Sequence, residues 1–294
     1  MQADFEICES DIAGTTITIT ASGGGGGGNY DFQIDPPGPG PKDNYNNESS
    51  PFSFDASGDL SVGVNTFLLE RVEASGGNGC ILTGSPIDAT VVTVDANVTT
   101  PTTGADENVC ATFYADLDGN TPGSGTGLWT VQGGSGASID DNLDPNTGVT
   151  NLDVGVNTFR WTITNGECEE FEEITITRNA LPVPALAGPN DVCEASIGNV
   201  YTTDAGMTNY VWVVDMDGTK TAGGAGTDNT VTVTWDNPGA QTVTVNYDDD
   251  NGCTASSPTI YNVTVNPNPT TSITPALPGE QCAGCIINNI QDTI

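Results

Sequence analysis

One stretch, between Cys193 and Val265, constrains the fold more than any other part of the sequence. It holds four runs rich in Val, Ile, Tyr and Trp, at residues 210–214, 230–235, 241–247 and 259–265, and in the last three these residues alternate with Thr or Asn. Alternation at every second residue, with many β-branched and aromatic side chains, is typical of strands buried on one face. Gly, Asp and Asn separate the runs, as turns require. The stretch therefore predicts a small β-sandwich.

Helix signals are nearly absent from the whole sequence. No window keeps the i, i+3, i+4, i+7 pattern of an amphipathic helix over three turns. With 37 glycines and 18 prolines in 294 residues, turn signals are abundant. No apolar run approaches the roughly 18 residues that a membrane helix needs. We expect an all-β chain without membrane insertion.

The strand pattern recurs toward the N-terminus. The pentapeptide Gly-Val-Asn-Thr-Phe occurs at residues 63–67 and again at residues 155–159, each time just before the strand that leads to a cysteine. An identical pentapeptide at a matching place indicates an internal repeat. Proline-containing segments at 99–103, 181–184 and 266–269 are interpreted as short linkers that limit bending.

These boundaries predict three β-sandwiches in series, at residues 1–98, 99–180 and 181–267. Residues 268–294 are expected to be a linker and the start of a fourth repeat that is cut off, so that the chain is a segment of a longer protein. The first sandwich contains residues 35–51, which are rich in Gly, Pro and Asn. We expect them to form a long exposed loop, too proline-rich and polar for a strand ladder.

The eight cysteines fall as one pair in each sandwich plus Cys282 and Cys285. In each sandwich a leading cysteine lies near the first strand, and a hairpin cysteine follows an Asn-Gly turn before the last strand. Pairs at recurring positions are typical of disulfides in oxidising compartments; the alternative is free buried thiols in a reducing cell. Cys282 is interpreted as the leading cysteine of the fourth repeat, because a redox or zinc site lacks its further groups. The predicted disulfides are Cys8–Cys80, Cys110–Cys168 and Cys193–Cys253.

The four tryptophans lie within the alternating patterns and are predicted to be core residues: Trp129, Trp161, Trp212 and Trp235. Trp129 and Trp212 follow their leading cysteines at the same spacing. A Cys, Trp, Cys order resembles the immunoglobulin-like arrangement in which a core tryptophan packs on a disulfide. A carbohydrate-binding module should instead show a row of surface aromatics.

The charge balance excludes several function classes. There are 39 acidic and 5 basic residues and no histidine, for a net charge of -34. Such a surface repels phosphate backbones, so we expect no nucleic-acid partner. Without histidine there is no Ser-His-Asp or Cys-His constellation, and we predict that the chain is not an enzyme. Paired-carboxylate glycosidase chemistry is the remaining enzymatic alternative, and the different acids in each repeat argue against it.

The candidate cofactor is calcium, at Asp116, Asp118 and Asn120. Asp-x-Asp spacing can start a calcium loop, because several oxygen ligands then converge. The EF-hand pattern fails, since Thr121 stands where its glycine is required and Gly127 where its glutamate is required. Asp-Gly and Asp-Asn are also ordinary turn residues, so a plain hairpin turn is the alternative.

The third sandwich resembles the PKD-like and immunoglobulin-like repeats of very large surface proteins in Bacteroidota. The second resembles a sister repeat of those proteins, and together the two resemblances cover about residues 104–267. The matching motifs are Tyr210-Val-Trp212, Val231-Thr-Val-Thr-Trp235, Asn251-Gly-Cys253, Tyr261-Asn-Val-Thr-Val-Asn-Pro267, Gly125-Thr-Gly-Leu-Trp129 and Asn165-Gly-Glu-Cys168.

Proteins of this family are typically exported by the type IX system and serve as adhesins, gliding tracks or extracellular filaments. The resemblance implies a cell-surface stalk, fibre or adhesive array whose partners are neighbouring repeats and surface glycans or proteins. One alternative is a self-assembling subunit of an extracellular filament or tube. Another is a carbohydrate-binding or spacer module of a secreted enzyme. The resemblance supplies no ligand-binding residue.

Overall fold

The computed structural model describes residues 1–22, 29–75, 80–114, 116–134 and 136–270. They form strands and one short 3-10 helix, η1 (Glu9–Asp11), which confirms the all-β prediction. Among the described residues no helix has the length and apolar character to cross a membrane. The chain divides into two units, Met1–Ala180 and Leu181–Ile294, and the first unit contains two sandwiches with separate cores.

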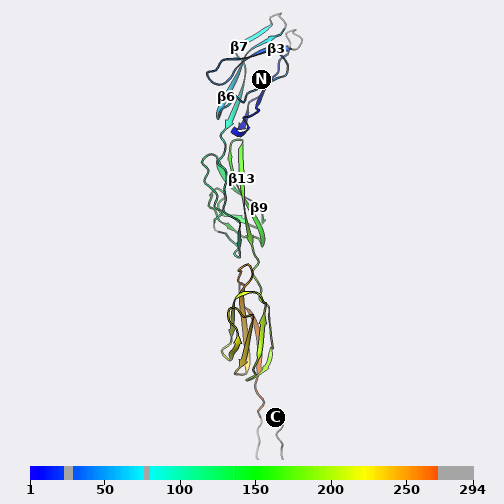
Figure 1. Cartoon of the computed structure of the whole chain (residues 1–294), viewed down its shortest axis with the longest axis vertical. Coiled ribbons are helices and arrows are strands. Elements are labelled where there is room, and N and C mark those ends of the chain that lie inside the picture. The colour runs from blue at the N-terminus through cyan, green and yellow to red at the C-terminus, as the bar shows by residue number, and fades with distance from the viewer. Residues whose placement is uncertain (23–28, 76–79, 115, 135, 271–294) are drawn as a thin grey trace, which may run out of the picture. The chain divides into compact units, whose positions relative to one another are not determined.

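The first sandwich packs a five-stranded sheet against a small second sheet, with one core between them (Figure 1). Its core includes Phe32, Phe67 and Val92, at most 2% exposed, because these residues occupy alternate strand positions. The larger sheet has the order β1-β7-β6-β3-β4, and the smaller pairs β2 with β5. The strands are β1 (Phe5–Cys8), β2 (Thr16–Ile19), β3 (Asn29–Asp35), β4 (Asp43–Ser49), β5 (Phe52–Asp55), β6 (Gly63–Ala74) and β7 (Ile81–Asp95).

The second sandwich is built around a pair of tryptophans. The rings of Trp129 and Trp161 lie 5.2 Å apart between centroids, and both side chains are at most 1% exposed. Its sheets have the orders β8-β13-β12-β9 and β10-β11. The strands are β8 (Glu107–Val109), β9 (Thr126–Gly133), β10 (Ser138–Ile139), β11 (Val149–Thr150), β12 (Gly155–Asn165) and β13 (Cys168–Arg178).

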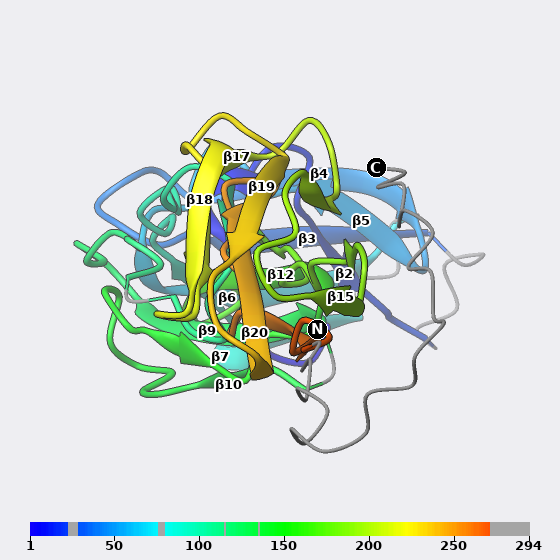
Figure 2. The same cartoon turned by 90° about the horizontal axis from the view of Figure 1, so that it is seen from below.

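The third sandwich forms the second unit and has two four-stranded sheets. Trp212 and Trp235 are buried in its core, the latter donating its indole N–H to the hydroxyl of Tyr201 at 3.0 Å. The sheet orders are β14-β16-β19-β18 and β15-β21-β20-β17, and Figure 2 shows β18 beside β19. The strands are β14 (Leu186–Ala187), β15 (Asp191–Cys193), β16 (Asn199–Thr203), β17 (Thr208–Val214), β18 (Gly218–Gly223), β19 (Thr230–Trp235), β20 (Gly239–Asp248) and β21 (Thr259–Asn266).

All three sandwiches share one feature of topology: a short strand near the start of the sandwich pairs in parallel with the last strand. β1 lies against β7, β8 against β13 and β15 against β21. The paired positions at the end of the last strand include Cys8 with Asp95 and Cys193 with Asn266. Each leading cysteine therefore lies at or next to the end from which the chain leaves its sandwich.

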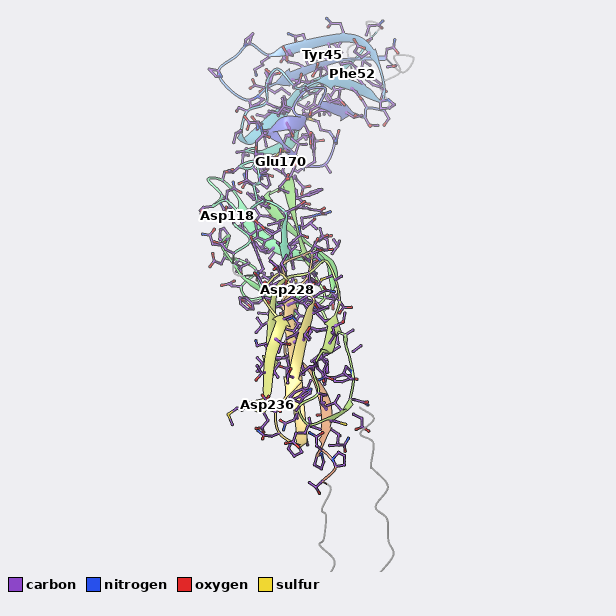
Figure 3. All side chains as sticks on the ribbon, turned by 60° about the horizontal axis from the view of Figure 1, so that its bottom comes forward. Tyr45, Phe52, Asp118, Glu170, Asp228 and Asp236 are labelled. Carbon is purple, nitrogen blue, oxygen red and sulfur yellow. A yellow bond between two sulfur atoms is a disulfide. The ribbon has the colours of Figure 1, made fainter. Side chains whose placement is uncertain are left out.

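The expected long loop at residues 35–51 is wrong in part. Residues 43–49 form β4, which pairs antiparallel with β3, so the connection is much shorter. β4 is an edge strand of its sheet and is paired on one side only, so its polar residues are tolerated. Tyr45 anchors it, its ring 5.0 Å from that of Phe52 (Figure 3). The expected fourth repeat, with Cys282 and Cys285, lies outside the described residues from residue 271 onward.

Candidate functional site

The joint between the first and second sandwiches is held by a disulfide. Cys8, at the end of β1, bonds to Cys168, at the start of β13, with their Cα atoms 4.9 Å apart. This bond excludes the predicted pairs Cys8–Cys80 and Cys110–Cys168. The leading cysteine of one sandwich is thus joined to the hairpin cysteine of the next.

The parallel pairing of first and last strands explains why the predicted pairs fail. Cys8 lies beside Asp95 at the end of β7, whereas Cys80 precedes the start of that 15-residue strand. At about 3.3 Å per residue the two cysteines are several tens of Å apart, and a disulfide needs Cα atoms within about 7 Å. The 11-residue β13 separates Cys110 from Cys168 in the same way.

The remaining described cysteines divide into two kinds. Cys110 and Cys253 are each disulfide-bonded. Cys80 and Cys193 are free and exposed, so the predicted pair Cys193–Cys253 is also wrong. The sequence carried a signal for this arrangement, because Cys110 and Cys193 each end a short segment just after a linker. Sequence reasoning placed that segment in its sandwich without considering which end of the sheet it would reach.

Hydrogen bonds reinforce the disulfide on the second sandwich's side of the joint. The turn between β12 and β13 points at the end of β7, where the Asp95 carboxylate accepts the backbone N–H of Glu167 at 2.9 Å. The Asn165 side chain donates to the carbonyl of Ala96 at 2.8 Å. Gly166, with φ +58, is required here because a Cβ would lie 1.9 Å from Asp95 Oδ2. This Asn-Gly turn therefore docks onto the preceding sandwich.

The linker at residues 99–103 is hydrogen-bonded to the second sandwich. The Thr99 hydroxyl accepts the backbone N–H groups of Gly123 at 2.8 Å and Ser124 at 3.1 Å. The Asn120 side chain donates to the carbonyl of Thr100 at 3.0 Å and accepts the N–H of Thr102 at 2.9 Å. Because these hydrogen bonds satisfy polar groups of the linker, the linker cannot swing freely without breaking the hydrogen bonds.

The candidate calcium residues take part in local structure. Asp116 accepts the N–H of Asp118, the residue labelled in Figure 3, at 2.8 Å, as in an Asx turn. The Asn120 amide is used by the linker. Leu117, between the two aspartates, is fully buried. Across the described parts of the chain, no group of three or more His, Cys, Asp or Glu could hold a metal ion. The geometry favours the turn interpretation.

The repeated pentapeptide has a role that sequence reasoning missed. Asn157 is fully buried, and its amide donates to the carbonyls of Asp153, Gly155 and Ile176 at 2.9, 3.0 and 3.2 Å. Its Oδ1 accepts the N–H of Asp153 at 2.9 Å. This side chain closes the turn before β12 and binds β13. A polar residue at a core position of an alternating strand was the available signal.

Asn65 makes the same set of bonds in the first sandwich. Its amide donates to the carbonyls of Ser61, Gly63 and Val92 at 2.7, 2.9 and 3.3 Å, and its Oδ1 accepts the N–H of Ser61 at 3.1 Å. The pentapeptide thus encodes one structural device twice.

Three β-sandwiches in tandem along the sequence define the class of protein to which these features belong. Residues 179–263 match the family model of the PKD-like domain, which covers the third sandwich. None of the curated proteins matches the sequence.

Three solved structures illustrate the structural neighbours of the chain. Titin domains I67–I69, in an E-to-A mutated variant, are 9% identical, cover 91% of this chain and 96% of that chain, and have a TM-score of 0.40. The human Desmocollin-1 ectodomain is 11% identical, with coverages of 92% and 61% and a TM-score of 0.34. Extracellular domains 3–5 of Drosophila OTK are 12% identical, with coverages of 91% and 95% and a TM-score of 0.30. At these scores no functional argument rests on the likeness.

Proposed function

We propose that this chain is a structural repeat segment of an extracellular cell-surface protein, acting as a stalk, fibre or adhesive array. The observation that carries the proposal is the joint, in which the disulfide Cys8–Cys168 and the bonded linker hold two sandwiches together. Disulfides persist in oxidising compartments, which supports an extracellular setting. The sequence resemblance over residues 104–267 supports export from a member of the Bacteroidota by the type IX system.

The mechanism is geometric. A series of sandwiches with restrained joints holds a distal tip away from the cell, or presents many weak contacts whose avidity adds up. The net charge of -34 keeps such a chain soluble and self-repelling. We propose no catalytic role. The rival carbohydrate-binding role requires a row of aromatic side chains on the surface. All four tryptophans are instead buried, at most 4% exposed.

The experiment that tests this function measures how rigid the joint is. Spin labels on a keto amino acid replace two exposed residues, Val64 in the first sandwich and Leu143 in the second. Electron spin resonance then gives the distribution of distances between them. We expect a narrow distribution for the oxidised protein and a broad one for the C8S/C168S variant. A broad distribution in the oxidised protein would contradict the proposed stalk.

A matched control places both labels in the second sandwich, at Leu143 and Val156, where the distribution should be narrow in both proteins. The location is checked separately by antibody labelling of intact cells that carry the parent protein. Labelling only after lysis would contradict an extracellular role.

A further inference from the structure

We propose that the first sandwich carries a binding site for a small uncharged molecule with a hydrocarbon chain, such as a long-chain alcohol. The site is a cleft of about 660 Å³ on the inner face of the β6–β7 hairpin. Sites that enclose small ligands have volumes of about 300 to 1,000 Å³. This site goes beyond the proposed structural role, which assigns no ligand to the chain.

The cleft exists because the two sheets of the first sandwich differ in length. β2 and β5 have four residues each, whereas β6 has 12 and β7 has 15. At about 3.3 Å per residue the small sheet spans about 13 Å, and β6 alone spans about 40 Å. The cleft begins where the small sheet ends, since Thr20 and Ala21, directly after β2, line one side of it. β2 and β5 therefore leave the inner face of the β6–β7 hairpin uncovered at its far end.

The cleft is lined mainly by apolar side chains that continue the core of the sandwich. Two of them, Leu69 and Ala74, are only 4% and 8% exposed. Leu82 pairs with Val72, which pairs with the core residue Phe32, so all three lie on the inner face. Leu82 is nevertheless 58% exposed. Exposed apolar surface that adjoins a concave site is typical of a place where a ligand binds.

The second sandwich has a charged residue at the matching place. Leu82 and Glu170, the latter labelled in Figure 3, each stand two residues after the hairpin cysteine of their sandwich. Glu170 pairs with the buried Ile163, so it too lies on the inner side of its sheet. A carboxylate at this position guards an exposed strand against apolar contacts. The two hairpins therefore differ in what their far ends can bind.

The charge of the cleft decides which ligand it takes. Asp88 has the one charged side chain among the described residues that line it. Its Oδ2 accepts a hydrogen bond from the ammonium group of Met1, and its Oδ1 accepts the N–H of Ala89 at 2.9 Å. Both oxygens are thus engaged, which leaves a cationic ligand without an anchor. An anionic ligand would be repelled by a chain of net charge -34. An uncharged ligand meets neither obstacle.

A partner β-strand fits the cleft less well than a small molecule does. β1 pairs with β7 only at Val92–Asp95, so β1 leaves the edge of β7 open beside the cleft. Residues 84–87, however, form a bulge opposite the single residue Glu70, and Pro86 within it has no N–H to donate. The bulge interrupts the row of backbone groups that a partner strand needs. Ile87, also in the bulge, lines the cleft and helps to enclose a ligand.

The test uses N-phenylnaphthylamine, an uncharged dye whose fluorescence rises in apolar surroundings. Three competitors share one hydrocarbon chain and differ only in the end group: decanol, decanoate and decylammonium. Each is added at physiological salt, below its micelle concentration. We expect decanol to displace the dye at a concentration at least about tenfold lower than either ion, because burying an unpaired charge is costly. Absence of dye binding, or displacement by decylammonium at a concentration equal to or lower than that of decanol, would overturn the proposal.

Three variants locate the site. L82E places a glutamate where the second sandwich has one, at an exposed side chain, and should weaken dye binding at least about tenfold. V72W fills the cleft without adding charge and should have the same effect. V64E is the matched control, because Val64 is exposed on the opposite face of β6 and acquires the same charge. Its dye affinity should equal that of the parent.

Denaturant unfolding checks that each variant is folded, and V72W decides the question if L82E is not. Dye binding that survives in a folded cleft variant, or an equal loss in V64E, would contradict a site in this cleft. The spin-label distances across Cys8–Cys168 should be unchanged in L82E, since the cleft lies at the other end of β7 from Cys8. The binding site and the proposed stalk are therefore tested independently.

Discussion

The β6–β7 hairpin of the first sandwich and the β12–β13 hairpin of the second begin alike and end differently. Both open on a glycine of positive φ, +108 at Gly63 and +102 at Gly155, a conformation that other residues rarely adopt. Two residues later each has the buried asparagine with its three carbonyl contacts. The sequence identity of the two pentapeptides is therefore an identity of structure.

The two hairpins are hydrogen-bonded to different sandwiches. The β12–β13 turn is bonded to the preceding sandwich through Asp95 and Cys8. The β6–β7 hairpin is held by its own sandwich, where Asp31 accepts the hydroxyl of Ser75 at 2.7 Å and the N–H of Asn47 at 2.6 Å. Local hydrogen bonding follows the repeated sequence, whereas the partner of a hairpin cysteine depends on which sandwich lies next to it.

The largest expected effect comes from removing the bond that only the second hairpin has. The C8S/C168S variant should lose about 2–5 kcal/mol from the unfolding free energy of residues 1–180, because the cross-link restricts the unfolded chain. Denaturant titration measures the loss. C80S, which removes a thiol that forms no bond in the structure, should stay within about 0.5 kcal/mol of the parent. An equal loss in C80S would show that the two hairpin cysteines do not differ.

The next effect should be shared by the two hairpins. N65A and N157A each leave three carbonyls, one buried and two partly buried, without their amide partner, and each should cost about 2–3 kcal/mol. V156A, an exposed residue of the same pentapeptide, is the matched control and should change stability by less than about 0.5 kcal/mol. Thermal and denaturant unfolding of the three variants measure these changes. A large loss in only one asparagine variant would break the equivalence.

The contrast also shows which features were predictable from the sequence. The strands and cores were predictable, because alternation at every second residue indicates directly which face of a strand is buried. Trp129 and Trp161 lie in such patterns. The strand β4 was not predictable from the sequence, since an edge strand can be almost wholly polar. Tyr45 is the one apolar anchor of β4.

The disulfide partners were also missed, for a different reason. Spacing shows that cysteines recur but not which end of a sheet each one reaches. That depends on the parallel pairing of Cys8 with the far end of β7, a long-range feature with no local signature. The buried Asn157 was visible only as part of a repeat, because its three acceptors come from two segments of the chain.

A smaller effect is expected from the turn that docks onto the first sandwich. G166A places a Cβ against the Asp95 carboxylate at a residue of φ +58, and should cost about 1–2 kcal/mol. It should also broaden the spin-label distances across the joint, since the bond from Glu167 to Asp95 is displaced. G58A, at a glycine with nothing within 4 Å of the added Cβ, is the control for a harmless methyl group. Unchanged distances in G166A would mean that the disulfide alone sets the joint.

The smallest expected effect on stability concerns the β6–β7 hairpin, which the carboxylate of Asp31 supports through the hydroxyl of Ser75. The N–H of Asn47 and the hydroxyl of Ser75 lower the pKa of Asp31 from its ordinary value of 3.8. A lowered pKa in the folded state means that this carboxylate stabilises the fold above pH 3.8. That contribution is lost as the pH falls below 3.8 through the folded-state pKa.

D31N should therefore be less stable than the parent near neutral pH, by no more than about 1 kcal/mol because solvent screens the site. The difference between the two proteins should shrink as the pH falls below 3.8. Comparing two proteins at each pH cancels the titration of the other acidic residues, which D31N leaves in place. Unfolding titrations at pH 7 and pH 3 measure the difference, and the C8S/C168S loss should be the same at both because no proton is bound there. If the stability difference between D31N and the parent were as large at pH 3 as at pH 7, the charge of Asp31 would not be what stabilises the first hairpin, and packing would be the cause.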